Sequence, residues 1–224
     1  MKVYNNLYDE PVKDLETPAI ETKESEENLD DKEVNFILGG QEPGPDLMEM
    51  TDGISISDSV VYLTGTIDEF TLADTIVKVR SVLKNREESK VGDPLNLIID
   101  SFGGCAYSMF GIVDYMESLD VKVNTICRGK AMSAGAIILA CGTGTRAASK
   151  RSTLMVHQGM AMSSGKTGDI RSSANHYSQM DDLMYELLGE KTNKDAKWWK
   201  ANMSHDKYMT ASEAIELGII DEIG

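Results

Sequence analysis

The stretch RGKAMSAGAIIL, residues 128–139, decides the fold. A run containing Val and Ile at 121–127 precedes it, and the apolar run 134–140 completes it. Between these runs lie small residues around Ser133, which let a backbone turn sharply and let neighbouring segments approach closely. The order predicts a strand, a tight turn and a buried helix. The Ser133 hydroxyl then points outward, beside the amide groups that begin the helix.

This turn has two interpretations. Amide groups at a helix N-terminus stabilise developing negative charge, so the stretch could supply a nucleophile, Ser133, and half of an oxyanion hole. Small-residue turns before buried helices also serve simply as packing devices. The turn alone does not decide between these interpretations. The decision depends on whether other residues of the chain can act with Ser133.

Charge divides the chain into two parts. Residues 1–50 hold 14 Asp and Glu against 4 Lys, with four of the five prolines, in a chain of 224 residues whose net charge is −15. A segment rich in acids and poor in apolar residues cannot bury enough surface to offset its ordering entropy. We therefore predict an acidic, disordered extension over residues 1–50 and a folded domain over 51–224. The extension either solubilises the chain or acts as a removable or docking segment.

Composition excludes several classes of protein. The sequence has no apolar run of about 18 residues that could span a membrane, and no recognisable secretory signal. Its acidity argues against binding to nucleic acid or to anionic membranes. Cys105, Cys127 and Cys141 lack the spacing of metal ligands, so we expect reduced thiols, no metal site and a cytoplasmic location.

Alternating elements predict an α/β fold. Apolar strands and amphipathic helices follow one another in the order 59–64, 68–88, 95–100, 106–119, 121–127 and 134–140. Such alternation is typical of βαβ units and a mainly parallel sheet. The strand 95–100 is apolar, so we expect it to be buried on both faces, with a turn at 101–104.

The remainder of the chain predicts shorter strands and a long helix. Strands are expected at 146–149, 153–157 and 219–223, and helices at 169–188, 192–199 and 211–217. Residues 160–168, rich in Gly, Ser and Met, are expected to form an extended arm or loop. Thr210 and Glu213 have the spacing of a capping box at the start of the last helix.

A serine nucleophile needs a base, and the chain has three histidines. His157 ends an apolar strand, at the edge where open α/β sheets place their sites, and a catalytic and a structural role are equally open for it. His176 is expected to be solvated on the long helix, and His205 lies in a polar loop. Lys130 could form a Ser–Lys dyad with Ser133, although a solvated lysine is expected there.

Three carboxylates could orient the base, namely Asp100, Asp169 and Asp206. Asp206 lies just before a helix, where an acid is also favourable for the helix itself. The backbone of Gly103 and Gly104 could complete an oxyanion hole, or form a tight turn and nothing more.

Four segments together resemble the proteolytic subunits of the ATP-dependent Clp protease, the ClpP family of serine peptidases. They are DSFGG at 100–104, ICRGKAMSAGAIILACGTGTR at 126–146, MVHQG at 155–159 and HDKYMTASEAIELGIIDEI at 205–223. The resemblance runs from about Ser59 to Ile223. It implies an α/β, crotonase/ClpP-like fold of stacked βαβ units, with a handle strand and a long handle helix supplied by the arm and the 169–188 helix.

The resemblance also implies a function and its residues. Ser133 is the implied nucleophile, His157 the general base and Asp206 the orienting acid, with the amides of Gly104 and Ala134 as the oxyanion hole. The implied activity is cleavage of peptides or unfolded proteins inside stacked heptameric rings of this chain. A Clp-type ATPase unfoldase is the implied partner, and it alone would use ATP, so no cofactor or metal is expected on this chain.

The sequence departs from the family pattern in several places, among them Met132 and Ala134 beside the serine, where only the backbone of Ala134 is needed. The acidic extension replaces the family's pore-lining N-terminus, Phe102 replaces a proline before the glycines, and Gly159 follows Gln158 where a proline is usual. Two alternatives therefore stay open, a phage-type maturation protease acting without an ATPase and a non-catalytic ring subunit. An acyl-CoA enzyme of the crotonase type would leave His157 and Asp206 without a shared task.

Overall fold

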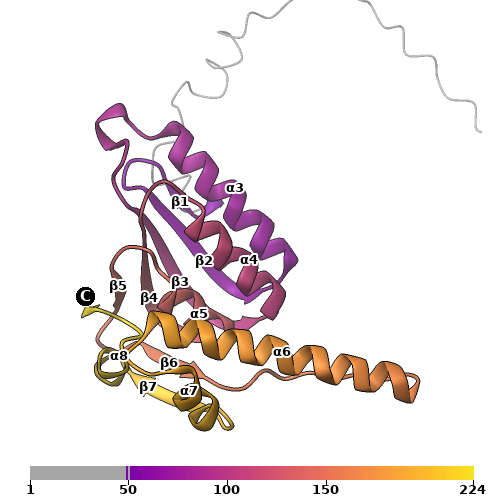
Figure 1. Ribbon diagram of the computed structural model, residues 1–224. Coiled ribbons are helices and arrows are strands. Elements are labelled where there is room, and N and C mark those ends of the chain that lie inside the picture. The colour runs from indigo at the N-terminus through magenta and orange to yellow at the C-terminus, as the bar shows by residue number, and fades with distance from the viewer. Residues whose placement is uncertain (1–48, 50) are drawn as a thin grey trace, which may run out of the picture. The chain divides into compact units, whose positions relative to one another are not determined.

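The computed structural model describes residue 49 and residues 51–224. The predicted extension over 1–50 falls almost wholly outside these residues and stays a prediction. Within the described part, the chain folds into a mostly parallel sheet with helices packed on it (Figure 1). No helix of that part combines the length and the apolar character needed to cross a bilayer.

The sheet follows the order β1-β2-β3-β4-β5-β8. Its strands are β1 (Ile54–Ser55), β2 (Val60–Ile67), β3 (Leu95–Gly104), β4 (Val123–Met132), β5 (Arg146–Ala148) and β8 (Glu222–Ile223). All neighbours in this path are parallel except β1 and β2. The predicted parallel βαβ organisation is therefore confirmed.

The far end of β4 pairs with a different strand from its beginning. Thr125–Cys127 pairs with β5, whereas Lys130–Met132 pairs in parallel with β6 (Thr153–Val156). Strand β7 (Lys207–Thr210) then adds antiparallel to β6. Because β4, β6 and β7 meet beyond the point where β5 ends, the residues that follow β4 and β6 and precede β7 are brought together.

The helices are α3 (Glu69–Asn85), α4 (Ala106–Glu117), α5 (Ala134–Ala140), α6 (Thr167–Lys191), α7 (Ala196–Asn202) and α8 (Ala211–Leu217), and a short 3-10 turn spans Glu88–Lys90. Helices α3 and α5 pack on strands β2–β4, and α4 packs between these two helices. Helices α3 and α4 lie beside each other on the sheet, and every residue of α5 is buried (Figure 1). The predicted capping box at Thr210 and Glu213 is present.

Helix α6 extends beyond the sheet. The preceding segment leaves β6 and runs alongside this helix toward its N-terminal end (Figure 1). Residues 157–166 form no strand in the described chain, so the arm is a loop and the implied handle strand has no strand partner here. The exposed side chains of Met160 and Met162 lie on this segment.

Strand β3 differs from the prediction in two ways. It continues through 101–104, where a turn was predicted, because β2 pairs with it as far as Gly104 and β4 as far as Ser101, with register shifts after Thr64 and Ile99 that absorb the irregular backbone. Its burial alternates, with Leu95, Leu97 and Ile99 buried and the residues between them half-buried. The prediction that both faces are buried is wrong for the single chain.

Other boundaries also differ from the prediction. Strand β4 continues to Met132, and β7 was not predicted at all. Helix α7 begins later than expected, at Ala196, because the Asp195 side chain caps it by accepting from the Trp198 amide. Helix α6 is longer than predicted at both ends, and β8 is shorter than the 219–223 strand.

Arg146, on strand β5, forms hydrogen bonds with Asp221, the residue before β8, and so holds the C-terminal strand at the edge of the sheet. Its guanidinium donates to both carboxylate oxygens of Asp221, at 3.1 and 2.6 Å. It also donates to the carbonyls of Ala140 and Lys191, at the ends of α5 and α6. The hydrogen bonds from Arg146 hold the pKa of Asp221 below its usual range.

We predict that Asp221→Asn lowers the free energy of unfolding at neutral pH and that the difference from the parent disappears in acid. The folded-state pKa lies below the unfolded value of about 3.9. The carboxylate therefore contributes stability above that value, and the contribution is lost as pH falls through the lowered pKa. Urea unfolding at a series of pH values measures the difference, with the exposed Asp114→Asn as control. A difference that persists unchanged in acid would contradict the prediction.

Candidate active site

Ser133 sits at the junction of β4 and α5 with a strained backbone. Its φ is 50° and its ψ is −123°, a conformation that costs a non-glycine residue about 1–3 kcal/mol. The Ser133 amide donates to the Met155 carbonyl of β6 at 2.8 Å, and its own carbonyl accepts from the first turn of α5. These bonds hold the turn and present the hydroxyl at the carboxyl end of the sheet.

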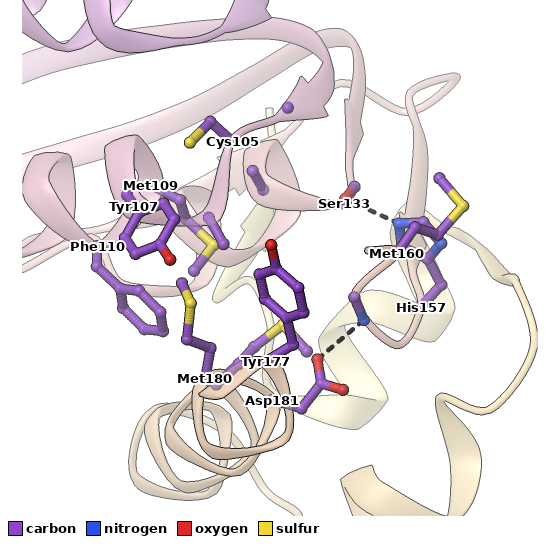
Figure 2. A pocket seen from close by; sticks show the side chains of 15 residues that line it. Cys105, Tyr107, Met109, Phe110, Ser133, His157, Met160, Tyr177, Met180 and Asp181 are labelled. Atoms are coloured by element: carbon purple, nitrogen blue, oxygen red, sulfur yellow. Dashed lines mark hydrogen bonds between the residues drawn. The ribbon is translucent and has the colours of Figure 1, made fainter. Parts of the chain in front are cut away.

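His157 is the first residue after β6, and its side chain reaches Ser133. The pairing of Met132 with Met155 places the ends of β4 and β6 side by side. The His157 Nε2 lies 2.8 Å from the Ser133 Oγ, a hydrogen-bond distance (Figure 2). The side chain is only 14% exposed, and the next amide, of Gln158, donates to the Met203 carbonyl. The Ser133 hydroxyl therefore contacts the imidazole, and a main-chain bond fixes the backbone that carries it.

Asp206 lies on the other side of the imidazole. Val156 pairs with Lys207 across β6 and β7, so the residue after Val156 faces the residue before Lys207. The Asp206 Oδ1 is 3.4 Å from the His157 Nδ1, and the carboxylate is 53% exposed. This distance is longer than a normal hydrogen bond, so Asp206 contacts the ring more loosely than Ser133 does.

Gly103 packs directly against the serine turn. A Cβ on Gly103 would lie 2.6 Å from both the Ser133 Cβ and the Met132 carbonyl oxygen, and the residue has a φ of +101°. The buried Ser101 hydroxyl fixes this backbone by accepting from the Gly103 amide and donating to the Gly65 carbonyl. Only glycine lets β3 approach the turn so closely.

Gly104 and Ala134, the residues expected to form the oxyanion hole, both lie beside Ser133 in the pocket lining. Ala134 is the first residue of α5, and an amide in a helix's first turn has no acceptor within the helix. Gly104 ends β3 on the opposite side, and both residues line the same pocket as Ser133 and His157. Two amides in this position could stabilise an oxyanion formed at a carbonyl attacked by Ser133.

A pocket of about 290 Å³ opens beside these groups (Figure 2). Its apolar lining comes from α4, from α6 and from the segment after His157, with the side chains of Met109, Phe110, Met160, Tyr177, Met180 and Met184. Asp181 is the one carboxylate among the lining residues, and the Cys105 thiol lies at the α4 side. Such a pocket fits one apolar side chain of a substrate bound at Ser133.

The structure gives the competing candidates other partners. Lys130 bonds to Asp100 at 2.7 Å and lies over the Phe102 ring, so the predicted alternative of a Ser–Lys dyad is not formed. His176 and the Tyr107 hydroxyl lie 2.8 Å apart. His205 contacts the neighbouring Ser204, and Asp169 lies exposed in the first turn of α6. Among residues 49 and 51–224, no three His, Cys, Asp or Glu side chains cluster as metal ligands would.

Sequence reasoning missed the part of the site that α6 supplies. Tyr177, Met180 and Met184 were assigned to an apolar stripe, and their spacing of three and four residues was the available signal for a shared face. Asp181 falls on that same face, and nothing in the sequence pattern singled it out. The close packing of Gly103 on Ser133 was also missed, since it joins segments far apart in the chain.

Comparisons with known proteins agree on one family. The family model described as Clp protease matches residues 49–224. The ATP-dependent Clp protease proteolytic subunit of Bacteroides thetaiotaomicron is 32% identical over 167 residues, which cover 74% of this chain and 74% of that protein. The ATP-dependent Clp protease proteolytic subunit 1 of Prochlorococcus marinus is 33% identical over 156 residues, 69% of this chain and 80% of that protein.

We predict that Gly103→Ala slows the reaction of Ser133 with a phosphonofluoridate, a serine-reactive probe, by about 100-fold. The added Cβ must displace the serine turn, and misplacement of a reacting group by about 1 Å has an effect of this size. Gly168→Ala is the control, because a Cβ there meets no neighbouring atom. Labelling rates followed by mass spectrometry make the measurement. Equal rates for the two variants would contradict the packing described above.

Proposed function

This chain belongs to the Clp protease family and is a serine endopeptidase of the ClpP type, and on that premise we propose how its residues hydrolyse a peptide bond. Ser133 acts as nucleophile, His157 as general base and Asp206 as the acid that orients the imidazole. The observation that carries the proposal is the 2.8 Å distance between the His157 Nε2 and the Ser133 Oγ. It puts a base where serine, otherwise a poor nucleophile, needs one.

The first half of the reaction acylates the serine. The Ser133 Oγ attacks the carbonyl carbon of the substrate as its proton passes to the His157 Nε2. The carbonyl oxygen gains negative charge and accepts from the amides of Gly104 and Ala134. The C–N bond then breaks, and the proton on His157 goes to the leaving amine. Asp206 favours the imidazolium that exists between these steps.

The second half releases the product by the same groups in reverse. A water molecule gives its proton to His157 and attacks the acyl carbon, again with the oxyanion between the two amides. The bond from the acyl carbon to Oγ breaks, and Ser133 regains its proton from His157. No metal or cofactor enters either half, so the proposal needs only this chain and water.

The pocket supports a preference for apolar side chains. Methionine and aromatic residues from α4 and α6 line it, and buried apolar surface contributes about 25 cal/mol per Å². We propose that it receives the substrate side chain next to the scissile bond. In the described chain, backbone groups of residues 160–165 make no hydrogen bond to other backbone groups. A peptide substrate can therefore add as a strand along this segment.

We further propose that the chain assembles into two stacked heptameric rings, with the arm and α6 joining the rings. The exposed apolar side chains of Met162, Ile170 and Leu183 on this part support burial against another copy. Relatives with the printed name of ATP-dependent Clp protease subunits support a Clp-type ATPase as partner. ATP is then consumed by that partner, and substrates reach the site already unfolded.

We predict that Ser133→Ala and His157→Ala each lower kcat for a short peptide by about 10⁴-fold or more. Asp206→Asn should lower it by a smaller factor, because the carboxylate is exposed and 3.4 Å from the ring. His205→Ala is the matched control, a neighbouring exposed histidine outside the site. Hydrolysis of a fluorogenic peptide gives kcat. Activity retained in Ser133→Ala would rule out Ser133, and inactivity of the parent chain would favour the non-catalytic alternative.

We predict that Met162→Asp combined with Ile170→Asp converts stacked rings into single rings. A charged side chain buried between two copies is strongly unfavourable. Val91→Asp is the control, since Val91 is also an exposed apolar residue but lies outside the arm and α6. Native mass spectrometry measures the assemblies. An unchanged double-ring mass would contradict the role of the arm. In a separate assay, degradation of a folded protein by the parent chain without any ATPase would favour the maturation-type alternative.

A further inference from the structure

The segment that follows His157, residues 158–160, is fastened to α6 through a single side chain. The Gly159 amide donates to the Asp181 Oδ1 at 3.0 Å (Figure 2). The Gln158 Nε2 donates to the Asp181 Oδ2 at 3.0 Å. We propose that Asp181 is a positioning residue for the substrate pocket. It holds residues 158–160, here called the His157 loop, against α6 and so sets the width of the substrate pocket.

The place of Asp181 on α6 argues for this role. Tyr177, Met180 and Met184 share its helix face and line the pocket with it. Asp181 is half-buried on this apolar face, so donors that bind its oxygens replace part of the water it loses there. Both donors that the structure gives to Asp181 come from the His157 loop. The carboxylate is half-buried, and the donors of the His157 loop bind both of its oxygens when the loop is in its present position.

The absence of a side chain at Gly159 leaves room for the Asp181 carboxylate that accepts from its amide. A Cβ on Gly159 would lie 2.6 Å from the Asp181 Oδ1, so a side chain at 159 would collide with the acceptor. A proline at this position would have no N–H to donate. Gly159 and Asp181 are therefore coupled, because a larger residue at 159 would have to displace the carboxylate that accepts from its amide.

The consequences for catalysis fall mainly on substrate binding. Gly159 and Met160 form the wall of the pocket on the His157 side. His157 has its own anchor, because the Gln158 amide donates to the Met203 carbonyl independently of Asp181. Loss of the Asp181 contacts should therefore release the pocket wall while the imidazole stays near Ser133. This inference rests on the proposed function, since it assigns the pocket to substrate.

A set of matched variants tests the proposal. Asp181→Ala removes both acceptors, whereas Asp181→Asn keeps one oxygen for the Gly159 amide and Gln158 can turn its own amide to match. Asp182→Ala is the control, because the neighbouring Asp182 pairs with Lys200 and does not line the pocket. Three quantities are measured for each: kcat and KM for a peptide with a large apolar residue at the cleaved bond, the labelling rate of Ser133 by a small phosphonofluoridate, and amide hydrogen exchange of residues 158–166.

For Asp181→Ala we expect KM to rise about 10-fold, the size typical of lost hydrogen bonds to a charged group, with a small change in kcat. Labelling by the small probe should stay near the parent rate, and exchange in 158–166 should speed up. Asp181→Asn should recover most of the parent KM, and Asp182→Ala should match the parent throughout. Unchanged KM and exchange in Asp181→Ala, or equal loss in Asp182→Ala, would overturn the proposal.

A double variant adds an independent check. Gly159→Ala should raise KM in the parent, because its Cβ meets the Asp181 carboxylate, and should have less effect when Asp181→Ala has removed that atom. Changes in KM that simply add in the double variant would overturn the proposal. The two hypotheses remain distinguishable, because a parent chain without peptidase activity would refute the proposed function while hydrogen exchange still reports whether Asp181 holds the loop.

Discussion

The backbone of Ser133 is held in a conformation that a serine adopts only under constraint, and the rest of the site depends on it. Three strands impose the constraint. Ser133 directly follows β4, and its amide donates to the Met155 carbonyl of β6. Strand β3 places Gly103 so close to Ser133 that a side chain on Gly103 would not fit. Strain of this kind persists where surrounding structure over-determines it, and such places are commonly catalytic. The turn exposes the hydroxyl and leaves the first amide of α5 beside it.

Strand register supplies the other groups of the site. Parallel pairing of β4 with β6 sets the ends of these strands side by side, and antiparallel pairing of β6 with β7 sets Asp206 opposite His157. The imidazole is thereby fixed by main-chain pairing, with Ser133 closer to it than Asp206 is. Helix α6 contributes in a different way, through side chains that form the pocket. In the proposed function, chemistry and substrate recognition therefore rest on separate parts of the fold, one on strand ends and one on a helix face.

Most of the fold and the central residues of the site were accessible from sequence, for identifiable reasons. Alternating apolar runs indicated the parallel sheet, and the resemblance of four segments singled out Ser133, His157 and Asp206. Local patterns failed where tertiary contacts decide. Residues 101–104 have the composition of a turn, yet pairing with β2 as far as Gly104 keeps them in a strand. Strand β7 is short and polar, and only its pairing with β6 makes it a strand. The contacts of Asp181 join residues 22 and 23 positions apart in the chain, and a pattern within one element cannot indicate such contacts.

The central claim is that a strained serine, a neighbouring imidazole and two amides act on one carbonyl. A crystal structure of the chain after reaction with a phosphonofluoridate tests it most directly, because the tetrahedral phosphorus mimics the intermediate. The account predicts phosphorus bonded to the Ser133 Oγ, with the phosphoryl oxygen within hydrogen-bond distance of the Gly104 and Ala134 amides. Phosphorus on another residue, or a phosphoryl oxygen turned to solvent, would contradict it.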